Sequence, residues 1–310
     1  MTVVADTCGR HIQKESKVDS LRVAAVQYEL SRPTSVQAWK AKLESYLKRA
    51  ADGHAQVVLL PELLSIEGMA LSDPDGHSPK EAIRKVASDL TPLFRSFFCE
   101  LSKRYAVTII AGTWPEMDRG KVYNVARVYS DGEVIHEQKK NHLTSGEITD
   151  YELTGGTGNA TAFQLPGGID AAIAICFDSE FPTYLPATTG VIPEVIFVPS
   201  MTSDDSGRYR VARSASARAV EFHAYVVVTG TTGGSETDPI FGTNVAQAKI
   251  FEPSDKLFPT DGVTASGTLN HDEIVFADLD LKRLRKSREI STVFPAKILH
   301  EAASSQRQTP

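Results

Sequence analysis

Three residues whose side chains can carry out chemistry stand at the ends of predicted strands. Cys176 ends a run of small and branched apolar residues, Glu62 follows four apolar residues and a proline, and Lys140 follows the second arm of a predicted hairpin. Strand ends are where α/β sheets place their ligand sites. A thiol near an ammonium group has a lowered pKa and is a nucleophile, and a carboxylate can accept and return a proton. The three residues therefore predict nucleophilic chemistry.

Each of these residues also has an inert interpretation. Glu62 could begin a solvent loop. Lys140 lies beside Lys139, and one lysine of such a pair is usually a solvated surface residue. Cys176 could be a core thiol, which is the commoner fate of a buried cysteine. The order of the three residues, together with their neighbours in the sequence, favours the chemical interpretation.

Alternating strands and helices must position these residues. Apolar side chains recur at helical spacing over 36–53, and Asp131-Gly132 is typical of the turn of a hairpin over 122–140. The strands are continuously apolar, so both of their faces are covered, and two packed sheets with helices outside satisfy this requirement. We expect strands at 21–28, 55–62, 107–114, 168–177, 194–201, 225–232 and 273–281, and helices at 36–53, 79–105, 208–224 and briefly after Pro182.

Composition excludes several classes of protein. The 310 residues are 41% hydrophobic and 23% charged, which is ordinary globular composition, and the net charge of −6 argues against nucleic acid or an anionic membrane as a partner. Three widely spaced cysteines form neither a disulfide framework nor a CxxC zinc pair, so we expect a cytoplasmic protein without a metal or cofactor. Residues 1–20 and 291–310 are expected as tails around one domain over 21–290.

Three short motifs resemble those of the nitrilase superfamily, the carbon–nitrogen hydrolases. They are "LLPELL" around Glu62, "KKNHL" around Lys140 and "CFDSEFP" at Cys176, in the family's order and spacing. The resemblance implies a four-layer α-β-β-α sandwich. It also implies that Glu62 is the general base, that Cys176 is the nucleophile and that Lys140, with the N–H of Phe177, stabilises the oxyanion. The family's second glutamate would be Glu147, for which Glu152 is a rival.

The resemblance also implies an activity, which is hydrolysis of a small amide or N-carbamoyl compound through a cysteinyl thioester, with release of ammonia or an amine. Phe177 stands where true nitrilases carry tryptophan, which favours an amide or N-carbamoyl substrate over a nitrile. Nitrile hydrolysis, acyl transfer to an amine and a non-catalytic binding protein are the alternatives. Phe177, Glu180 and Tyr123 are candidate substrate contacts. Glu180 predicts a substrate that is neutral or cationic near it, unless it turns outward to Arg208 or Arg210. A homodimer or larger homo-oligomer is expected.

Overall fold

The computed structural model of the chain describes residues 17–185 and 191–306. The predicted N-terminal tail, residues 1–20, lies outside these ranges except for its last four residues, and Ser20 already begins a strand. The first and last elements of the predicted domain are the strand from Ser20 and the helix that ends at Ile290. No helix in the described ranges has the length and apolar character needed to cross a membrane.

Alternating side chains of the first strand, β1 (Ser20–Glu29), separate two hydrophobic cores. Val23 and Ala25 pack in one core with residues of β7 and β8, whereas Ala24 and Val26 pack in the other with residues of α1 and α4. Successive side chains of a strand point to opposite faces. One core therefore lies between two sheets, and the other lies between the first sheet and its covering helices.

The strands form two sheets that meet where β1 pairs with β9. In the first sheet the order is β5-β4-β3-β2-β1, with β13 antiparallel to β1 on its other side. In the second sheet β6, β7, β8 and β9 are followed by β11 and β12. The strands are β1 (Ser20–Glu29), β2 (Val57–Leu59), β3 (Thr108–Asp118), β4 (Lys121–Ser130), β5 (Glu133–Lys139), β6 (Phe163–Leu165), β7 (Ile169–Ile173), β8 (Val195–Ser200), β9 (Tyr225–Gly234), β10 (Thr243–Asn244), β11 (Lys249–Phe251), β12 (Val263–Ser266) and β13 (Glu273–Asp280).

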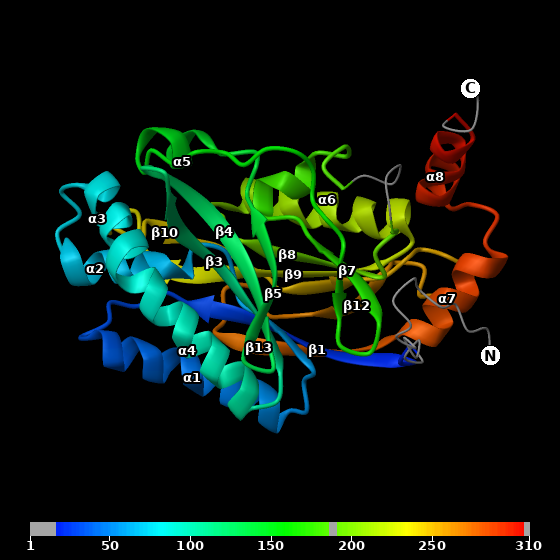
Figure 1. Cartoon of the computed structure of the whole chain (residues 1–310), viewed down its shortest axis with the longest axis horizontal. Coiled ribbons are helices and arrows are strands. Elements are labelled where there is room, and N and C mark those ends of the chain that lie inside the picture. Colours follow the sequence, from blue (N-terminus) through cyan, green and yellow to red (C-terminus); the bar gives the residue numbers. More distant parts are fainter. Residues whose placement is uncertain (1–16, 186–190, 307–310) are drawn as a thin grey trace, which may run out of the picture.

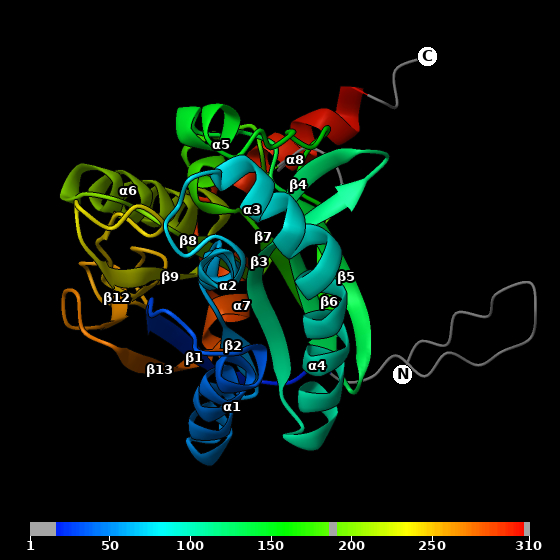
Figure 2. The same cartoon turned by 90° about the vertical axis from the view of Figure 1, so that its left-hand side faces the viewer.

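Helices cover the outer faces of the sheets, so the predicted α-β-β-α sandwich is confirmed. Figure 1 shows α1 and α4 below the strands and α6 above them, and Figure 2 shows the same layers from one end. The Trp39 ring of α1 lies 4.4 Å from that of Phe94 in α4 and anchors the first helical layer. The helices are α1 (Val36–Asp52), α2 (Met69–Ser72), α3 (Pro79–Lys85), α4 (Thr91–Arg104), α5 (Ser145–Thr149), α6 (Asp205–Phe222), α7 (Leu281–Ile290) and α8 (Pro295–Gln306), with short turns η1 (Leu64–Gly68), η2 (Val86–Leu90) and η3 (Cys176–Glu180).

Several predicted boundaries differ from the structure. The helix expected over 79–105 is interrupted by the π-turn η2 between α3 and α4. The strand expected over 168–177 stops at Ile173, and Cys176 instead begins η3. No helix forms at 182–185, and the rest of the helix expected after Pro182 falls outside the described residues.

The predicted C-terminal tail is also wrong in part. Residues 291–310 were expected to be a tail, yet α8 occupies Pro295–Gln306. The reason is burial, because Phe294 and Ala296 are 5% and 0% exposed and belong to the hydrophobic core that also contains residues of β7, β8 and α6. Apolar side chains that leave water in this way stabilise the helix that carries them, at about 25 cal/mol for each Å² of apolar surface.

Candidate active site

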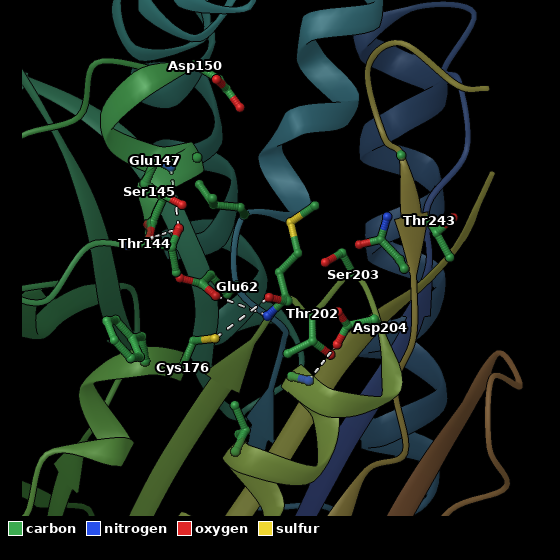
Figure 3. Close-up of a pocket in the computed structure, with 18 of the residues that line it drawn as sticks. Glu62, Thr144, Ser145, Glu147, Asp150, Cys176, Thr202, Ser203, Asp204 and Thr243 are labelled. Carbon is green, nitrogen blue, oxygen red and sulfur yellow. Dashed lines mark hydrogen bonds between the residues drawn. The ribbon is translucent and has the colours of Figure 1, made fainter. Parts of the chain in front are cut away.

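The ends of β2, β5 and β7 converge on one pocket with a volume of about 460 Å³. Glu62 follows β2, Lys140 follows β5 and Cys176 follows β7, and all three line the pocket. Figure 3 shows Glu62 and Cys176 in this lining. Glu147, from the first turn of α5, lines it as well. The structure thus brings together four residues from three separate segments of the sequence.

A buried ion-pair network holds the acidic and basic groups. The Nζ of Lys140 lies 2.8 Å from Oε1 of Glu62 and 2.6 Å from Oε2 of Glu147. The three side chains are at most 6% exposed. The backbone N–H of Met201 donates to the other oxygen of Glu62 at 3.0 Å. A single ammonium group therefore lies between two carboxylates in a buried site.

Asn124, which the sequence analysis missed, joins the two carboxylates. Its Nδ2 donates to Oε1 of Glu62 and to Oε1 of Glu147, at 3.0 Å in each case. The residue is fully buried on β4, beside the strand end that carries Lys140. The available signal was a polar amide inside the apolar run "VYNVARV", because a buried amide needs partners for its hydrogen bonds.

The backbone at Glu62 and Cys176 turns sharply. Leu63 and Cys176 both have a φ of 46°, in the left-handed region that non-glycine residues seldom adopt. The N–H of Leu63 donates to Oγ1 of Thr113 at 2.9 Å, which holds the first turn. The thiol of Cys176 donates to the carbonyl of Met201 at 3.7 Å. A strained backbone of this kind costs about 1–3 kcal/mol and persists where the surrounding structure holds it, often at active sites.

Burial controls the protonation of the thiol. It raises the pKa of Cys176 above the ordinary 9.0, and the charge of Glu62 raises that pKa further, while Lys140 lowers it. Lys140 thus lowers the pKa of the thiol as expected, but burial and Glu62 outweigh this effect and the net shift is upward. The raised pKa favours the protonated thiol at neutral pH, so a base would have to take its proton before the sulfur could attack a carbonyl.

Glu62 is placed to be that base. Burial raises its pKa above the ordinary 4.5, Lys140 opposes this shift, and the nearby charge of Glu147 adds to it. For Lys140, burial lowers the pKa, but the charges of Glu62, Cys176 and Glu147 more than offset this effect, and the net shift is upward. A carboxylate with a raised pKa accepts a thiol proton more readily, and the lysine keeps its positive charge.

Asp178 links the lysine segment to the cysteine turn. Its carboxylate is fully buried and accepts hydrogen bonds from the N–H groups of Asn141 and His142, at 2.8 Å for His142. It also lies 2.7 Å from Nδ1 of His142, whose ring stacks on Phe181 with centroids 3.7 Å apart. The residues that follow Lys140 are thereby held against the residues that follow the thiol.

Two residues considered in the sequence analysis, Tyr123 and Glu152, do not line this pocket. Tyr123 was a candidate substrate contact, but it is absent from the pocket lining, and the ammonium of Lys139 lies 4.0 Å from its ring centre. Neighbouring strand residues face opposite sides, so Asn124 reaches the site and Tyr123 does not. Glu152, the rival of Glu147, is exposed and pairs with Lys80 instead.

Phe177 and Glu180 both line the pocket. Oε1 of Glu180 lies 3.4 Å from Nε of Arg210, which also lines the pocket, whereas Arg208 pairs with Asp205. Glu180 therefore faces the pocket and at the same time contacts one of the two arginines considered for it. Within the described residues no cluster of three or more His, Cys, Asp or Glu side chains could hold a metal ion.

Comparison with known proteins identifies the family. Residues 22–289 match the family model for carbon-nitrogen hydrolases. The chain is 31% identical to the probable hydrolase YhcX of Bacillus subtilis over 88% of its own length, and it spans 52% of that longer protein. It is 25% identical to the human omega-amidase NIT2 over 90% of this chain and 95% of that protein. Its fold is similar to the crystal structure of Saccharomyces cerevisiae Nit3, a member of branch 10 of the nitrilase superfamily, with a TM-score of 0.69, 20% identity and coverage of 89% and 96% of the two chains. The chain therefore belongs to the carbon–nitrogen hydrolase family.

Proposed function

We propose that this chain hydrolyses a non-peptide C–N bond of a small amide or N-carbamoyl compound through a thioester on Cys176. The observation that carries the proposal is the buried set of Glu62, Lys140 and Glu147 beside a thiol in one pocket. A buried ion pair with a desolvated nucleophile contributes little to stability by comparison with an apolar core. Its presence in the lining of a cavity supports a catalytic role.

The first half of the proposed reaction forms the thioester. Glu62 takes the proton of the Cys176 thiol while the sulfur attacks the carbonyl carbon. The carbonyl oxygen becomes an oxyanion and interacts with the ammonium of Lys140 and the N–H of Phe177, which is one of the first amides of η3. The tetrahedral intermediate then breaks its C–N bond, and Glu62 returns the proton to the departing nitrogen.

The second half of the reaction consumes one water molecule. Glu62 removes a proton from the water, and the water oxygen attacks the thioester carbon. The ammonium of Lys140 and the N–H of Phe177 stabilise this second oxyanion as they did the first. The C–S bond breaks, the sulfur recovers its proton from Glu62, and the acid leaves. The enzyme returns to its starting state with no net change in its own protons.

Glu147 acts on Lys140 in this proposal. One of its oxygens lies 2.6 Å from the ammonium and also accepts from the N–H and the hydroxyl of Thr144, at 2.9 and 3.0 Å. Thr144 caps α5 and receives the N–H of Glu147 in return. A residue held from both sides in this way fixes where the ammonium points before the substrate arrives.

The experiment is ammonia release from a panel of small amides, carbamoyl compounds and nitriles. We expect turnover of at least one amide or carbamoyl compound, and its complete loss in a folded Cys176→Ala variant. Cys99→Ala is the matched control, because Cys99 lies on α4 outside the pocket lining. Intact-mass measurement during turnover should detect the acyl group on the wild-type chain. Mass analysis of the products with a competing amine present distinguishes acyl transfer, which gives the substituted amide, from hydrolysis, which gives the acid. Undiminished ammonia release by Cys176→Ala would refute the mechanism.

A further inference from the structure

The walls of the pocket beyond the catalytic set carry mostly negative charge. The lining residues that ionise there are Asp150, Glu180, Asp204 and Arg210, three carboxylates against one guanidinium. With Glu62, Glu147 and Lys140 included, five carboxylates face two cations, which leaves a formal charge of −3 around one cavity. A cleft lined by one sign of charge concentrates ligands of the opposite sign.

Two of these carboxylates have no cationic partner in the described part of the chain. Asp150 is exposed at the end of α5 and accepts only from the hydroxyl of Thr149, at 2.7 Å. Asp204 caps α6 with Oδ1, which accepts from the N–H of Gly207 at 2.6 Å. Figure 3 shows the carboxylates of Asp150 and Asp204 on opposite sides of the cavity. A charged group between them would meet negative charge from both walls.

The single wall cation is already in contact with a carboxylate. Nε of Arg210 lies 3.4 Å from Glu180, and the Arg210 side chain is 60% exposed. A substrate carboxylate would have to compete with Glu180 for this arginine while it faces Asp150 and Asp204. A substrate cation would not have to displace Glu180 from Arg210. Specificity therefore follows from repulsion of a negatively charged substrate as well as from attraction of a positively charged one.

We infer that the substrate carries an ammonium or guanidinium group at the end remote from the amide, and that this group lies between Asp150 and Asp204. The inference rests on the proposed function, because it names the substrate class of the same pocket. Polar neutral side chains also line the pocket and can hydrogen-bond the polar groups of a small molecule; they are Ser145, Thr202, Ser203 and Thr243.

Three amides of matched length test the inference: 5-aminopentanamide, 5-hydroxypentanamide and glutaramate. We expect kcat/KM for the ammonium amide to exceed that for the carboxylate amide by at least about tenfold at low ionic strength, with the hydroxyl amide between them. Added salt should reduce the ratio, because exposed charges are screened over about 10 Å at 0.1 M. A preference for the carboxylate amide, or the same kcat/KM for all three, would overturn the inference.

Substitutions locate the charge that causes the preference. Asp150→Asn and Asp204→Asn should each lower the ratio of ammonium to hydroxyl amide several-fold, and Asn is as good a helix cap as Asp. The control is Asp205→Asn, one residue away and outside the pocket lining, where Asp205 pairs with Arg208. If the control lowers the ratio as much as Asp204→Asn, the two-wall placement is wrong.

Binding keeps this inference separate from the proposed function. Calorimetric titration of the three amides into the Cys176→Ala variant needs no turnover. If none of the amides is hydrolysed but the ammonium amide still binds most tightly, the reaction was assigned wrongly and the charge preference stands. If hydrolysis occurs and the carboxylate amide binds most tightly, the reaction stands and the charge preference is wrong.

Discussion

Replacing Lys140 with methionine removes the only cation from a buried network while keeping a side chain of similar length. In the wild-type chain one ammonium lies 2.8 Å from Glu62 and 2.6 Å from Glu147, and the three side chains are at most 6% exposed. The variant would leave two carboxylates facing each other without a counter-charge. Breaking a buried pair from one side costs about 3–5 kcal/mol.

Uptake of a proton limits this cost and makes it depend on pH. One added proton restores the net charge that the ammonium gave the network. Protonating a carboxyl whose ordinary pKa is 4.5 costs about 1.36 kcal/mol for each pH unit above that value, which is about 3.4 kcal/mol at pH 7 and about 0.7 kcal/mol at pH 5. The folded variant then binds one more proton than the unfolded chain, so its stability falls as pH rises above 4.5.

Denaturant unfolding of wild type and Lys140→Met at pH 5 and pH 7 measures this effect. We expect the variant to lose about 2.7 kcal/mol more free energy of unfolding at pH 7 than at pH 5, relative to wild type, from two pH units at about 1.36 kcal/mol each. Its kcat should be reduced by about 10²–10³ at both pH values, because the oxyanion loses a donor that no proton on a carboxylate replaces.

Lys139→Met is the matched control. Lys139 pairs with Asp118 on the surface, where 34% and 53% of the two side chains are exposed, and such pairs contribute at most about 1 kcal/mol. The control should be nearly neutral in both stability and kcat. A stability loss in Lys140→Met that is the same at both pH values, or an equal loss in Lys139→Met, would refute the reasoning.

Three further predictions follow from the same network. Glu147→Gln should cut kcat sharply while Glu152→Gln has a mild effect, and equal small effects in steady-state assays would remove Glu147 from the site. Iodoacetamide should alkylate Cys176 at a rate that changes less than about threefold from pH 7 to 8, because Glu62 takes the thiol proton, whereas a free thiol gains nearly tenfold; a free-thiol profile would contradict this. Asp178→Asn should lower kcat about tenfold with little change in KM, since the lysine segment loses an acceptor, and a change in KM alone would assign Asp178 to substrate binding instead.

The positions of the reactive residues were predictable because they depend on short-range patterns. Glu62 and Cys176 follow apolar runs, Lys140 follows the second arm of a hairpin, and strand ends in an α/β protein converge at one edge. The resemblance of "KKNHL" to the family's lysine motif implied Lys140 rather than Lys139. In the structure Lys140 contacts Glu62 and Glu147, whereas Lys139 pairs with Asp118. The two-residue period of a strand excludes Tyr123 once Asn124 is known to face the site.

Boundaries were less predictable because propensity alone does not set them. The apolar run through Cys176 indicates a strand, but β7 ends at Ile173 and the thiol lies on a left-handed residue. Helix α8 forms in a segment of polar appearance because Phe294 and Ala296 find buried positions against distant elements. Tertiary packing routinely overrides local preference in such cases.

The sequence by itself determined the family, the layered fold and three of the reactive side chains, because all of these are written in local spacing. Only the tertiary structure decided the partnership of Asn124 with two carboxylates, the choice of Glu147 over Glu152, and the upward shift of the thiol pKa. Each of those depends on burial and on distances between segments that lie far apart in the sequence; Glu62 and Cys176, for example, are separated by more than one hundred residues. A nearby lysine lowers the pKa of a thiol in any context. Whether burial and a neighbouring carboxylate outweigh this effect depends on the positions that these groups take in the folded chain.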